Sequence, residues 1–215
     1  MSFVEVWEIF SSIQGESTFA GLPCVFVRLS GCNLSCDYCD TQDAATGTGE
    51  RMSVDDIVSK VKKYKIPLVE VTGGEPLLQV GVLELLEKLN DAGLKILVET
   101  NGSVKIEKFD RRARYIVDIK TPGSGEGGSF DDRNFATLSA RDEVKFVITS
   151  KADFEWAVAI CKKYRLTEKT AVLFSPAYGK VELVDLAGWI MSSNLPVRLN
   201  LQLHKYIFGP DAKGV

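Results

Sequence analysis

The sequence predicts an α/β fold in which parallel strands and helices alternate to form an incomplete barrel. Three observations carry this prediction: apolar runs of strand length recur, helical patterns separate them, and unusual polar motifs stand where the strands end. Regular alternation of strand, loop and helix is typical of parallel βαβ units. The carboxyl ends of such strands open on one face of a barrel, so we expect a single gathered site there.

Seven apolar runs bounded by turn residues are the candidate strands. Each is rich in Val, Ile, Leu or Phe, and several lack strict alternation of apolar and polar residues, which is typical of parallel strands buried on both faces. The runs span residues 24–30, 67–73, 94–101, 114–120, 143–149, 170–176 and 196–202.

Four helical patterns lie between these runs. Two of them begin at Ser53 and Ser150, each followed three residues later by an aspartate in the spacing of a capping box. Another stops at Gly93, a candidate C-cap. The patterns span residues 53–65, 77–93, 150–166 and 180–194. Seven strands with four clear helices indicate an incomplete barrel rather than a closed eight-stranded one, within a single domain over residues 1–215.

The composition indicates a soluble globular protein, with 45% hydrophobic and 26% charged residues among 215. A net charge of −3 gives no electrostatic case for binding nucleic acid or an anionic membrane. The N-terminal segment lacks the pattern of a signal peptide, and no apolar run reaches the length of about 18 residues that a membrane span needs. Five cysteines, mostly clustered, do not suggest a secreted disulfide scaffold. We therefore expect a cytoplasmic protein.

Three cysteines, Cys32, Cys36 and Cys39, follow the first strand with the spacing C-x3-C-x2-C. Thiolates packed this tightly bind iron–sulfur clusters or zinc. A structural zinc site needs a fourth ligand, and the remaining Cys and His residues form no second short pair with which to supply it. Three thiolates on a cubic cluster leave one iron open to a small molecule, which is the arrangement we favour.

The stretch CNLSCDYCDT, with Tyr38 directly before the third cysteine, resembles the signature of the radical S-adenosylmethionine superfamily. The TGGEP motif at residues 72–76 is similar to the glycine-rich motif with which that superfamily holds the methionyl amine. The resemblance implies a partial (βα)6-type barrel, a 4Fe-4S cluster and S-adenosyl-L-methionine as cofactors.

Motifs spread over essentially the whole chain resemble the 7-carboxy-7-deazaguanine synthase family. They read EIFSSIQGES, FVRLSGCNLSCDYCDT, ETNGS, DIKTPGSG, SPAYG and QLHK. This resemblance implies a lyase of queuosine and 7-deazapurine biosynthesis, which uses Mg2+ and converts 6-carboxy-5,6,7,8-tetrahydropterin to 7-carboxy-7-deazaguanine with loss of ammonia. One departure is Ser17, where the family's segment more often reads QGEG.

The resemblance also assigns residues to the site. It implies cluster ligands at Cys32, Cys36 and Cys39, and a magnesium ligand at Thr41. It places S-adenosylmethionine against Tyr38, Cys39, Asp40, Gly74, Glu75, Lys120, Ser175 and Pro176, and the substrate against Ile13, Gln14, Gly15, Glu16, Arg28 and Thr72. Arg28 suits the substrate carboxylate, because a guanidinium can bind it through two charge-assisted bonds. Gln14, as donor and acceptor, and Glu16, as acceptor, suit the amide-like pterin edge.

Several alternatives stay open. A glycyl-radical-enzyme activase of the same superfamily would share the cysteines and TGGEP, and an electron carrier or zinc-stabilised module would share the cysteines alone. The GSGEGG run at 123–128 matches a dinucleotide fingerprint but runs into a polar segment, so we expect it to line the S-adenosylmethionine site instead. Glu99 and Asp118 could hold neighbouring loops, and His204 ends a strand near the site. By resemblance, we expect a flavodoxin- or ferredoxin-type electron donor and a homodimer.

Overall fold

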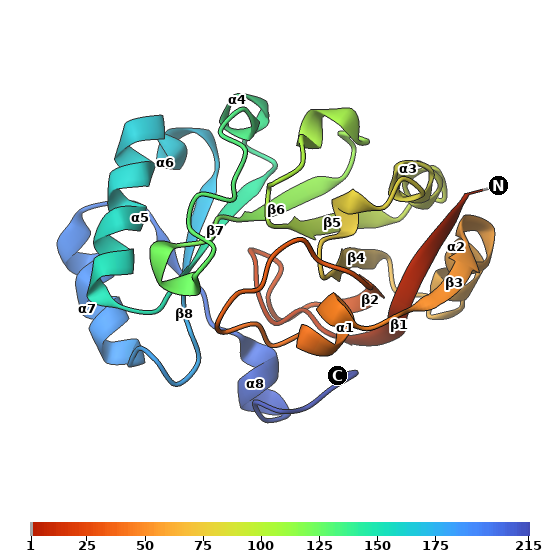
Figure 1. The fold of residues 1–215 in the computed structure, drawn as a ribbon, viewed down its shortest axis with the longest axis horizontal. Helices are drawn as coiled ribbons and strands as arrows, with labels where there is room; N and C mark the ends of the chain where they lie inside the picture. Colours follow the sequence, from red (N-terminus) through yellow and green to blue (C-terminus); the bar gives the residue numbers. More distant parts are fainter. Residues whose placement is uncertain (1) are drawn as a thin grey trace.

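One nine-stranded sheet organises the computed structural model, which describes residues 2–215. Its strand order is β3-β1-β2-β4-β5-β6-β7-β8-β9, and Figure 1 shows the sheet curving around a central space. The strands are β1 (Phe3–Ile13), β2 (Pro23–Leu29), β3 (Glu50–Ser53), β4 (Leu68–Gly73), β5 (Lys95–Thr100), β6 (Arg114–Asp118), β7 (Glu143–Ile148), β8 (Ala171–Pro176) and β9 (Arg198–Leu199).

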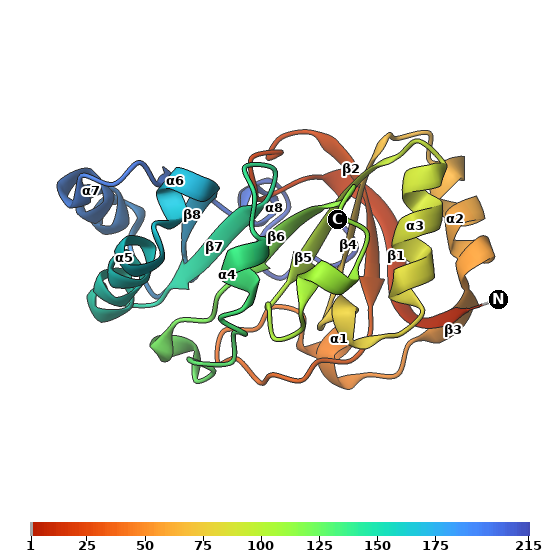
Figure 2. The same ribbon diagram turned by 90° about the horizontal axis from the view of Figure 1, so that it is seen from above.

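The seven predicted strands form the parallel part of this sheet, from β2 through β4 to β9. Within residues 2–215 the end strands β3 and β9 each pair on one side only, so the barrel does not close. The fold prediction of an incomplete parallel barrel is therefore confirmed. In Figure 2 the loops that follow β2, β4 and β6 run along the same edge of the molecule.

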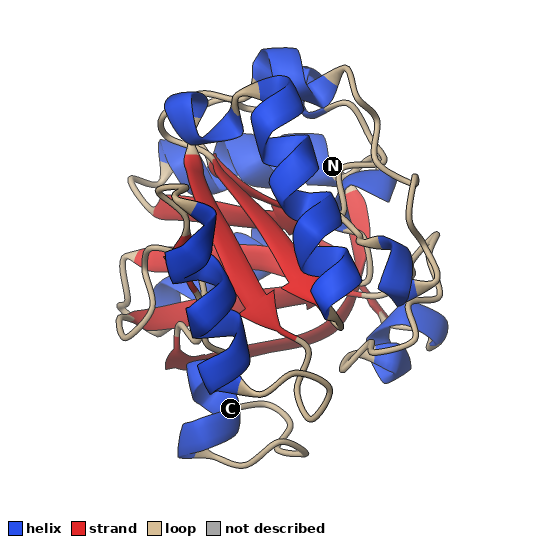
Figure 3. Ribbon diagram, turned by 90° about the vertical axis from the view of Figure 1, so that its left-hand side faces the viewer, coloured by secondary structure: helices blue, strands red, loops and turns tan. Residues whose placement is uncertain are grey.

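Helices cover the outer face of the curved sheet. Figure 1 shows α2 and α3 beside the β1 end and α5 and α7 beside the β8 end, and Figure 3 shows the latter side with its helices in front of the strands. The longer helices are α2 (Val54–Lys63), α3 (Val82–Asp91), α5 (Lys151–Tyr164) and α7 (Leu183–Ser193). The shorter ones are α1 (Gln42–Thr46), α4 (Asn134–Thr137), α6 (Leu166–Lys169) and α8 (Leu203–Ile207). None of the helices in the described chain combines the length and apolarity needed to cross a membrane.

Alternation along the strands separates two cores, as β4 illustrates. Val69 and Val71 point outward into the large core beneath the helices. Leu68 points into the barrel, where it joins a small apolar cluster with Phe19, Cys24, Phe26, Leu97 and Ile116. Because side chains alternate with a period of two, Glu70 and Thr72 share the inner face of Leu68. The inside of the barrel is thus apolar at one level and polar nearer the carboxyl ends of the strands.

Three details differ from the sequence prediction. The antiparallel strands β1 and β3 were not predicted, and β9 is reduced to two residues at the open edge of the sheet. Helix α3 begins at Val82 rather than near Leu77, because Pro76–Leu78 form a 3-10 turn capped by the Glu75 side chain. The Ser53 and Ser150 caps are confirmed, since each hydroxyl accepts the backbone N–H of the aspartate three residues on.

Candidate active site

A cavity of about 630 Å³ opens at the carboxyl ends of the parallel strands. It is lined by most of the residues that the sequence assigned to a site: Ile13, Gln14, Gly15, Glu16, Arg28, Cys32, Cys36, Tyr38, Cys39, Asp40, Thr41, Thr72, Gly74 and Lys120. These residues come from segments far apart in the sequence, and the order of the strands brings them to one edge of the sheet. The expectation of one gathered site is therefore met by the geometry.

The cysteine loop, residues 30–41, is bonded at its base to the TGGEP motif. The backbone N–H of Glu75 donates to the carbonyl of Gly31 at 2.8 Å, and that of Gly74 donates to the carbonyl of Leu29 at 3.1 Å. A Cβ atom on Gly74 would lie 2.1 Å from the carbonyl oxygen of Gly31. Only glycine permits this approach, so the two motifs pack together because of the residue type at position 74.

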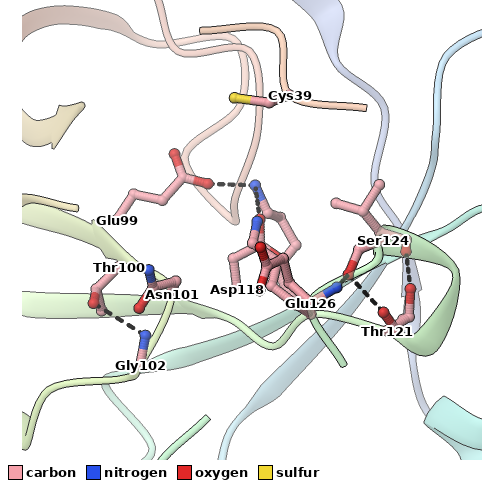
Figure 4. A network of polar contacts seen from close by, with 12 residues as sticks. Cys39, Glu99, Thr100, Asn101, Gly102, Asp118, Thr121, Ser124 and Glu126 are labelled. Carbon is pink, nitrogen blue, oxygen red and sulfur yellow. Dashed lines mark hydrogen bonds and ion pairs between the residues drawn. The ribbon is translucent and has the colours of Figure 1, made fainter. Parts of the chain in front are cut away.

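The far side of the cysteine loop is held by the loop that follows β6. The N–H of Ser35 donates to the Glu126 carboxylate at 2.7 Å, and the N–H of Asp37 donates to the carbonyl of Ser124 at 3.0 Å. Figure 4 shows Thr121, Ser124 and Glu126 together in this turn. The GSGEGG run does not line the cavity as expected; it braces the cysteine loop instead.

The Glu75 side chain is also committed to structure. It is 1% exposed and accepts hydrogen bonds from the N–H of Leu77, the hydroxyl of Thr100 and the N–H of Asn101. Burial raises its pKa to about 7, against the effect of these donors. It therefore ties the TGGEP motif to the end of β5 and does not line the cavity.

Ser175 and Pro176 likewise lie outside the cavity lining. Both are buried, and the Ser175 hydroxyl accepts from the amide of Asn200 at 2.9 Å. The next residues, Ala177 and Tyr178, reach the cavity in their place. Membership of the SPAYG motif indicated the right loop, but the motif alone did not show which of its side chains face inward.

The three clustered cysteines are free thiols on one loop, and all three line the cavity. The sulfur of Cys32 accepts the backbone N–H of Leu34 at 3.4 Å, and burial raises the pKa of Cys36 to about 11. Among residues 2–215, no three His, Cys, Asp or Glu side chains converge closely enough to hold a single metal ion. A cluster in which each thiolate binds a different iron does not require such convergence.

The other two cysteines are packed in cores. Cys24 belongs to the apolar cluster inside the barrel, and Cys161 packs beneath the helices on α5. Neither can supply the fourth ligand of a zinc site on the cysteine loop. The donor set of three thiols facing one cavity fits an iron–sulfur cluster with an open iron.

Two buried polar atoms in the cavity wall lack a partner within the described chain: the hydroxyl of Tyr38 and the Oδ1 atom of Asp118. Buried polar groups are normally hydrogen-bonded. The Tyr38 ring also lies 5.9 Å from the ammonium groups of both Lys120 and Lys180. An aromatic ring, cations and unpaired polar atoms together fit a bound ligand that carries both polar and aromatic parts.

A charged network that sequence reasoning missed fills the inside of the barrel. Lys145 on β7 donates to Glu16 at 2.8 Å, lies 3.3 Å from Asp118, and also pairs with Glu99. Lys120 pairs with Asp118 at 2.9 Å. Although burial opposes it, these carboxylates raise the pKa of Lys145 well above its usual value. Figure 4 shows Glu99 and Asp118 pointing toward this common centre, with Cys39 beyond.

The proposed substrate contacts are held by protein partners. Gln14 donates from Nε2 to Glu70 at 2.5 Å and accepts from the N–H of Glu16 at 3.1 Å, so its amide is less free to meet a ligand than the sequence suggested. Arg28 lines the cavity and donates from Nε to Glu8 at 2.8 Å, and its terminal nitrogens make no hydrogen bond within residues 2–215. Glu70 and Lys145 could have been noticed in the sequence, because each is a charged residue flanked on both sides by apolar residues of a predicted strand.

His204 and the C-terminal segment complete the mouth of the cavity. The N–H of Leu203 donates to the carbonyl of Gly15 at 2.9 Å, and a Cβ on Gly15 would lie 2.2 Å from Nδ1 of His204. Residues 210–215 also line the cavity, and Lys213 pairs with Asp43 beside the cysteine loop. No motif in residues 210–215 indicated a role for this segment.

The model of the radical SAM superfamily matches residues 26–168. Over 99% of this chain, a 7-carboxy-7-deazaguanine synthase of Koribacter versatilis is 43% identical and is covered over its full length, and one of Chlorobaculum tepidum is 45% identical and 97% covered. The crystal structure of QueE from Escherichia coli covers 94% of this chain and 95% of its own, with a TM-score of 0.77 and 21% identity. SuiB of Streptococcus suis bound to S-adenosylmethionine covers 75% of this chain and 41% of its own, with a TM-score of 0.55 and 15% identity.

Proposed function

This chain belongs to the radical SAM superfamily and, within it, to the 7-carboxy-7-deazaguanine synthase family, and from that membership we propose its reaction. The substrate is 6-carboxy-5,6,7,8-tetrahydropterin, and the products are 7-carboxy-7-deazaguanine and ammonia. The relatives that match over the full chain are synthases, so the activase alternative has no support from them.

One observation carries this proposal. The cysteine loop, the TGGEP motif and the 13–16 segment meet around a single cavity. The cysteine loop and the TGGEP motif are common to the superfamily. The 13–16 segment favours a small-molecule substrate, because an activase that acts on a partner protein does not need such a binding segment. The 13–16 segment lines the same cavity as the cysteines and is bonded to Glu70, Lys145 and the first turn of α8.

The cysteine thiolates would hold a 4Fe-4S cluster, with S-adenosylmethionine against Tyr38, Asp40, Gly74 and Lys120. When bound, these cofactors supply the radical chemistry that removes a hydrogen atom from the substrate. The chain's own contribution is to hold the cysteine loop from both sides. Glu75, Ser175 and Pro176 support the loops from beneath rather than touch the ligand, as their burial and bonding indicate.

The substrate carboxylate is proposed to bind the terminal nitrogens of Arg28. Its pterin edge then meets the 13–16 segment and Thr72. Glu16 is held in place because one oxygen accepts from Lys145 and the other from Gln202 at 2.9 Å. A carboxylate fixed in this way presents its remaining lone pairs to ring N–H groups without first having to be ordered.

Magnesium is proposed at Thr41, whose hydroxyl lies 3.7 Å from the sulfur of Cys39 at the cavity wall. A single protein hydroxyl, completed by substrate oxygens and water, suits a hard octahedral ion. A homodimer, a flavodoxin- or ferredoxin-type electron donor, a cytoplasmic location and a single domain over residues 1–215 also stay proposals. The single sheet supports the last of these.

The test is anaerobic turnover of iron- and sulfide-reconstituted protein with S-adenosylmethionine, magnesium, dithionite and the pterin, followed by mass spectrometry. We expect a product lighter than the substrate by one ammonia, and its loss in Cys32→Ala. Formation of 5′-deoxyadenosine with the pterin unchanged would agree with the superfamily assignment but would contradict the proposed substrate.

A further inference from the structure

Glu70 is a carboxyl group in an unusual place. It lies on the inner face of β4, is 4% exposed, and forms part of the cavity wall just above the apolar cluster inside the barrel. Burial, followed by the charge of Glu99, raises its pKa to about 8. A buried ionisable group in an otherwise apolar strand costs stability, so its presence calls for a compensating role.

The hydrogen bonds of Glu70 lead to the 13–16 segment. Its Oε2 atom accepts from Nε2 of Gln14 at 2.5 Å, and Oε1 of Gln14 accepts from the N–H of Glu16 at 3.1 Å. The amide of Gln14, 3% exposed, is therefore bonded at both ends. This matters because an amide rotated by 180° exchanges its donor and its acceptor while occupying the same space.

The two partners of Gln14 allow only one amide orientation. The N–H of Glu16 must face an acceptor, and Glu70 offers an oxygen to a donor whether its carboxyl is ionised or protonated. Lys145, Glu16 and Glu99 also face Glu70, but within residues 2–215 no other side chain bonds Nε2 of Gln14. The orientation is therefore set by the N–H of Glu16 at the oxygen end of the amide and by Glu70 at the nitrogen end, where no second side chain of the described residues replaces it.

We propose that Glu70 is a positioning residue for substrate binding, which acts by fixing the orientation of the Gln14 amide and, through it, the 13–16 segment. The inference rests on the proposed function, in which this segment meets the pterin edge. It extends that function by placing a specificity determinant on β4, behind the residues that touch the ligand.

The test is the dissociation constant of 6-carboxy-5,6,7,8-tetrahydropterin, measured by anaerobic calorimetry. The protein is reconstituted and bound to S-adenosylmethionine and magnesium but is not reduced, so no turnover occurs. Glu70→Gln keeps an acceptor and should bind within threefold of wild type. Glu70→Leu removes the acceptor and should weaken binding about tenfold. Iron content and thermal melting show whether each variant is folded and loaded.

Cys24→Ala is the matched control. Cys24 is packed beside Glu70 inside the barrel but makes no bond to Gln14, so this variant disturbs the same region without releasing the amide. Its dissociation constant should equal that of wild type. Weakening as large as in Glu70→Leu would mean that packing alone is responsible, and would overturn the inference.

A double-variant cycle separates positioning from direct contact. If Glu70 acts through Gln14, then adding Glu70→Leu to Gln14→Ala should change the dissociation constant no further. An additional tenfold loss would show that Glu70 touches the substrate itself, and unchanged binding in Glu70→Leu alone would show that it does neither; both results overturn the inference. Wild-type protein that fails to bind the pterin would instead overturn the proposed function, and the inference with it.

Discussion

Charged side chains are buried at both ends of the barrel interior. At one end their hydrogen-bonding groups are paired within the protein, whereas at the other end some of these groups have no partner in the part of the chain that the structure describes. At the amino ends of the strands, Glu143 is completely buried and accepts from the N–H and hydroxyl of Thr18 and from Arg114. Phe19 closes this end beneath the cations of Lys95 and Arg114. At the carboxyl ends of the strands, Arg28 donates a hydrogen bond only from Nε, and one oxygen of Asp118 has no hydrogen-bond partner within residues 2–215.

This difference shows that burial of a charge does not by itself identify a site. Glu143 is more buried than Glu70, yet its bonds are all made within the protein and it does not line the cavity described above. Arg28 and Asp118 keep bonding capacity on a cavity that is large enough for a ligand. Hydrogen-bonding groups without a partner beside a cavity, rather than buried charge, distinguish the end that we propose to be functional from the structural one.

The largest effect is expected from exchanging the two arginines for alanine. Arg28→Ala should lower kcat/KM for the pterin about 100-fold, because a charge-assisted contact to the carboxylate is lost, and should leave the melting temperature nearly unchanged. Arg114→Ala should do the reverse: kcat/KM within threefold of wild type, with a lower melting temperature. Steady-state kinetics and thermal melting check both. A loss of activity in Arg114→Ala equal to that in Arg28→Ala would erase the distinction between the ends.

Glu143→Ala should lower the free energy of unfolding by about 2 kcal/mol, because Thr18 and Arg114 lose a buried charged acceptor. Urea denaturation measures this loss. The affinity for the pterin should stay within threefold of wild type, since Glu143 does not line the cavity. A strong loss of affinity in a variant that remains folded would mean that the closed end is coupled to the site.

The pH dependence of stability should report on Glu70. Its pKa is raised to about 8, first by burial and then by Glu99, so the folded protein holds a proton that the unfolded chain has already released above its ordinary pKa. Stability from this group therefore falls as pH rises from about 5 to 8. We expect Glu70→Gln to gain stability on wild type as the pH rises from 5 to 8.5, measured by denaturation at each pH. A difference that stays constant with pH would contradict this.

The smallest effect concerns Ser17, in the turn at the closed end. Its φ of +65° is in the left-handed region, and its hydroxyl accepts the N–H of Phe19 at 3.0 Å. Ser17→Gly should relieve about 1 kcal/mol of strain but lose that bond, for a net gain of roughly 0.5 kcal/mol. Lys65→Gly is the control. Lys65 is exposed and has a φ of +58°, so its replacement relieves the backbone strain without losing such a hydrogen bond. A net loss in Ser17→Gly would show that the hydroxyl bond outweighs the strain.

Apolar runs bounded by turn residues were enough to predict the parallel strands, because those strands are buried on both faces. Strands β1 and β3 were not predicted. β1 is half-exposed, and the motif EIFSSIQGES that it carries was interpreted only as a ligand-binding segment. Motif position located the cysteines and the 13–16 segment. It could not show that Glu75 bonds to Thr100 and Asn101, 25 and 26 residues away in the chain, or that Lys145 pairs with three carboxylates, because those contacts depend on strand order.

The bracing of the cysteine loop bears on how the protein acquires its cluster. The bonds that join the loop to its neighbours use the carbonyls of Gly31 and Ser124 and the carboxylate of Glu126, and none of these three involves a cysteine sulfur. In zinc fingers the metal supplies the folding energy, whereas here hydrogen bonds from two neighbouring loops also hold the segment that carries the thiols. We therefore expect the fold of the barrel to tolerate loss of the cluster, because those outer contacts do not depend on a cysteine sulfur.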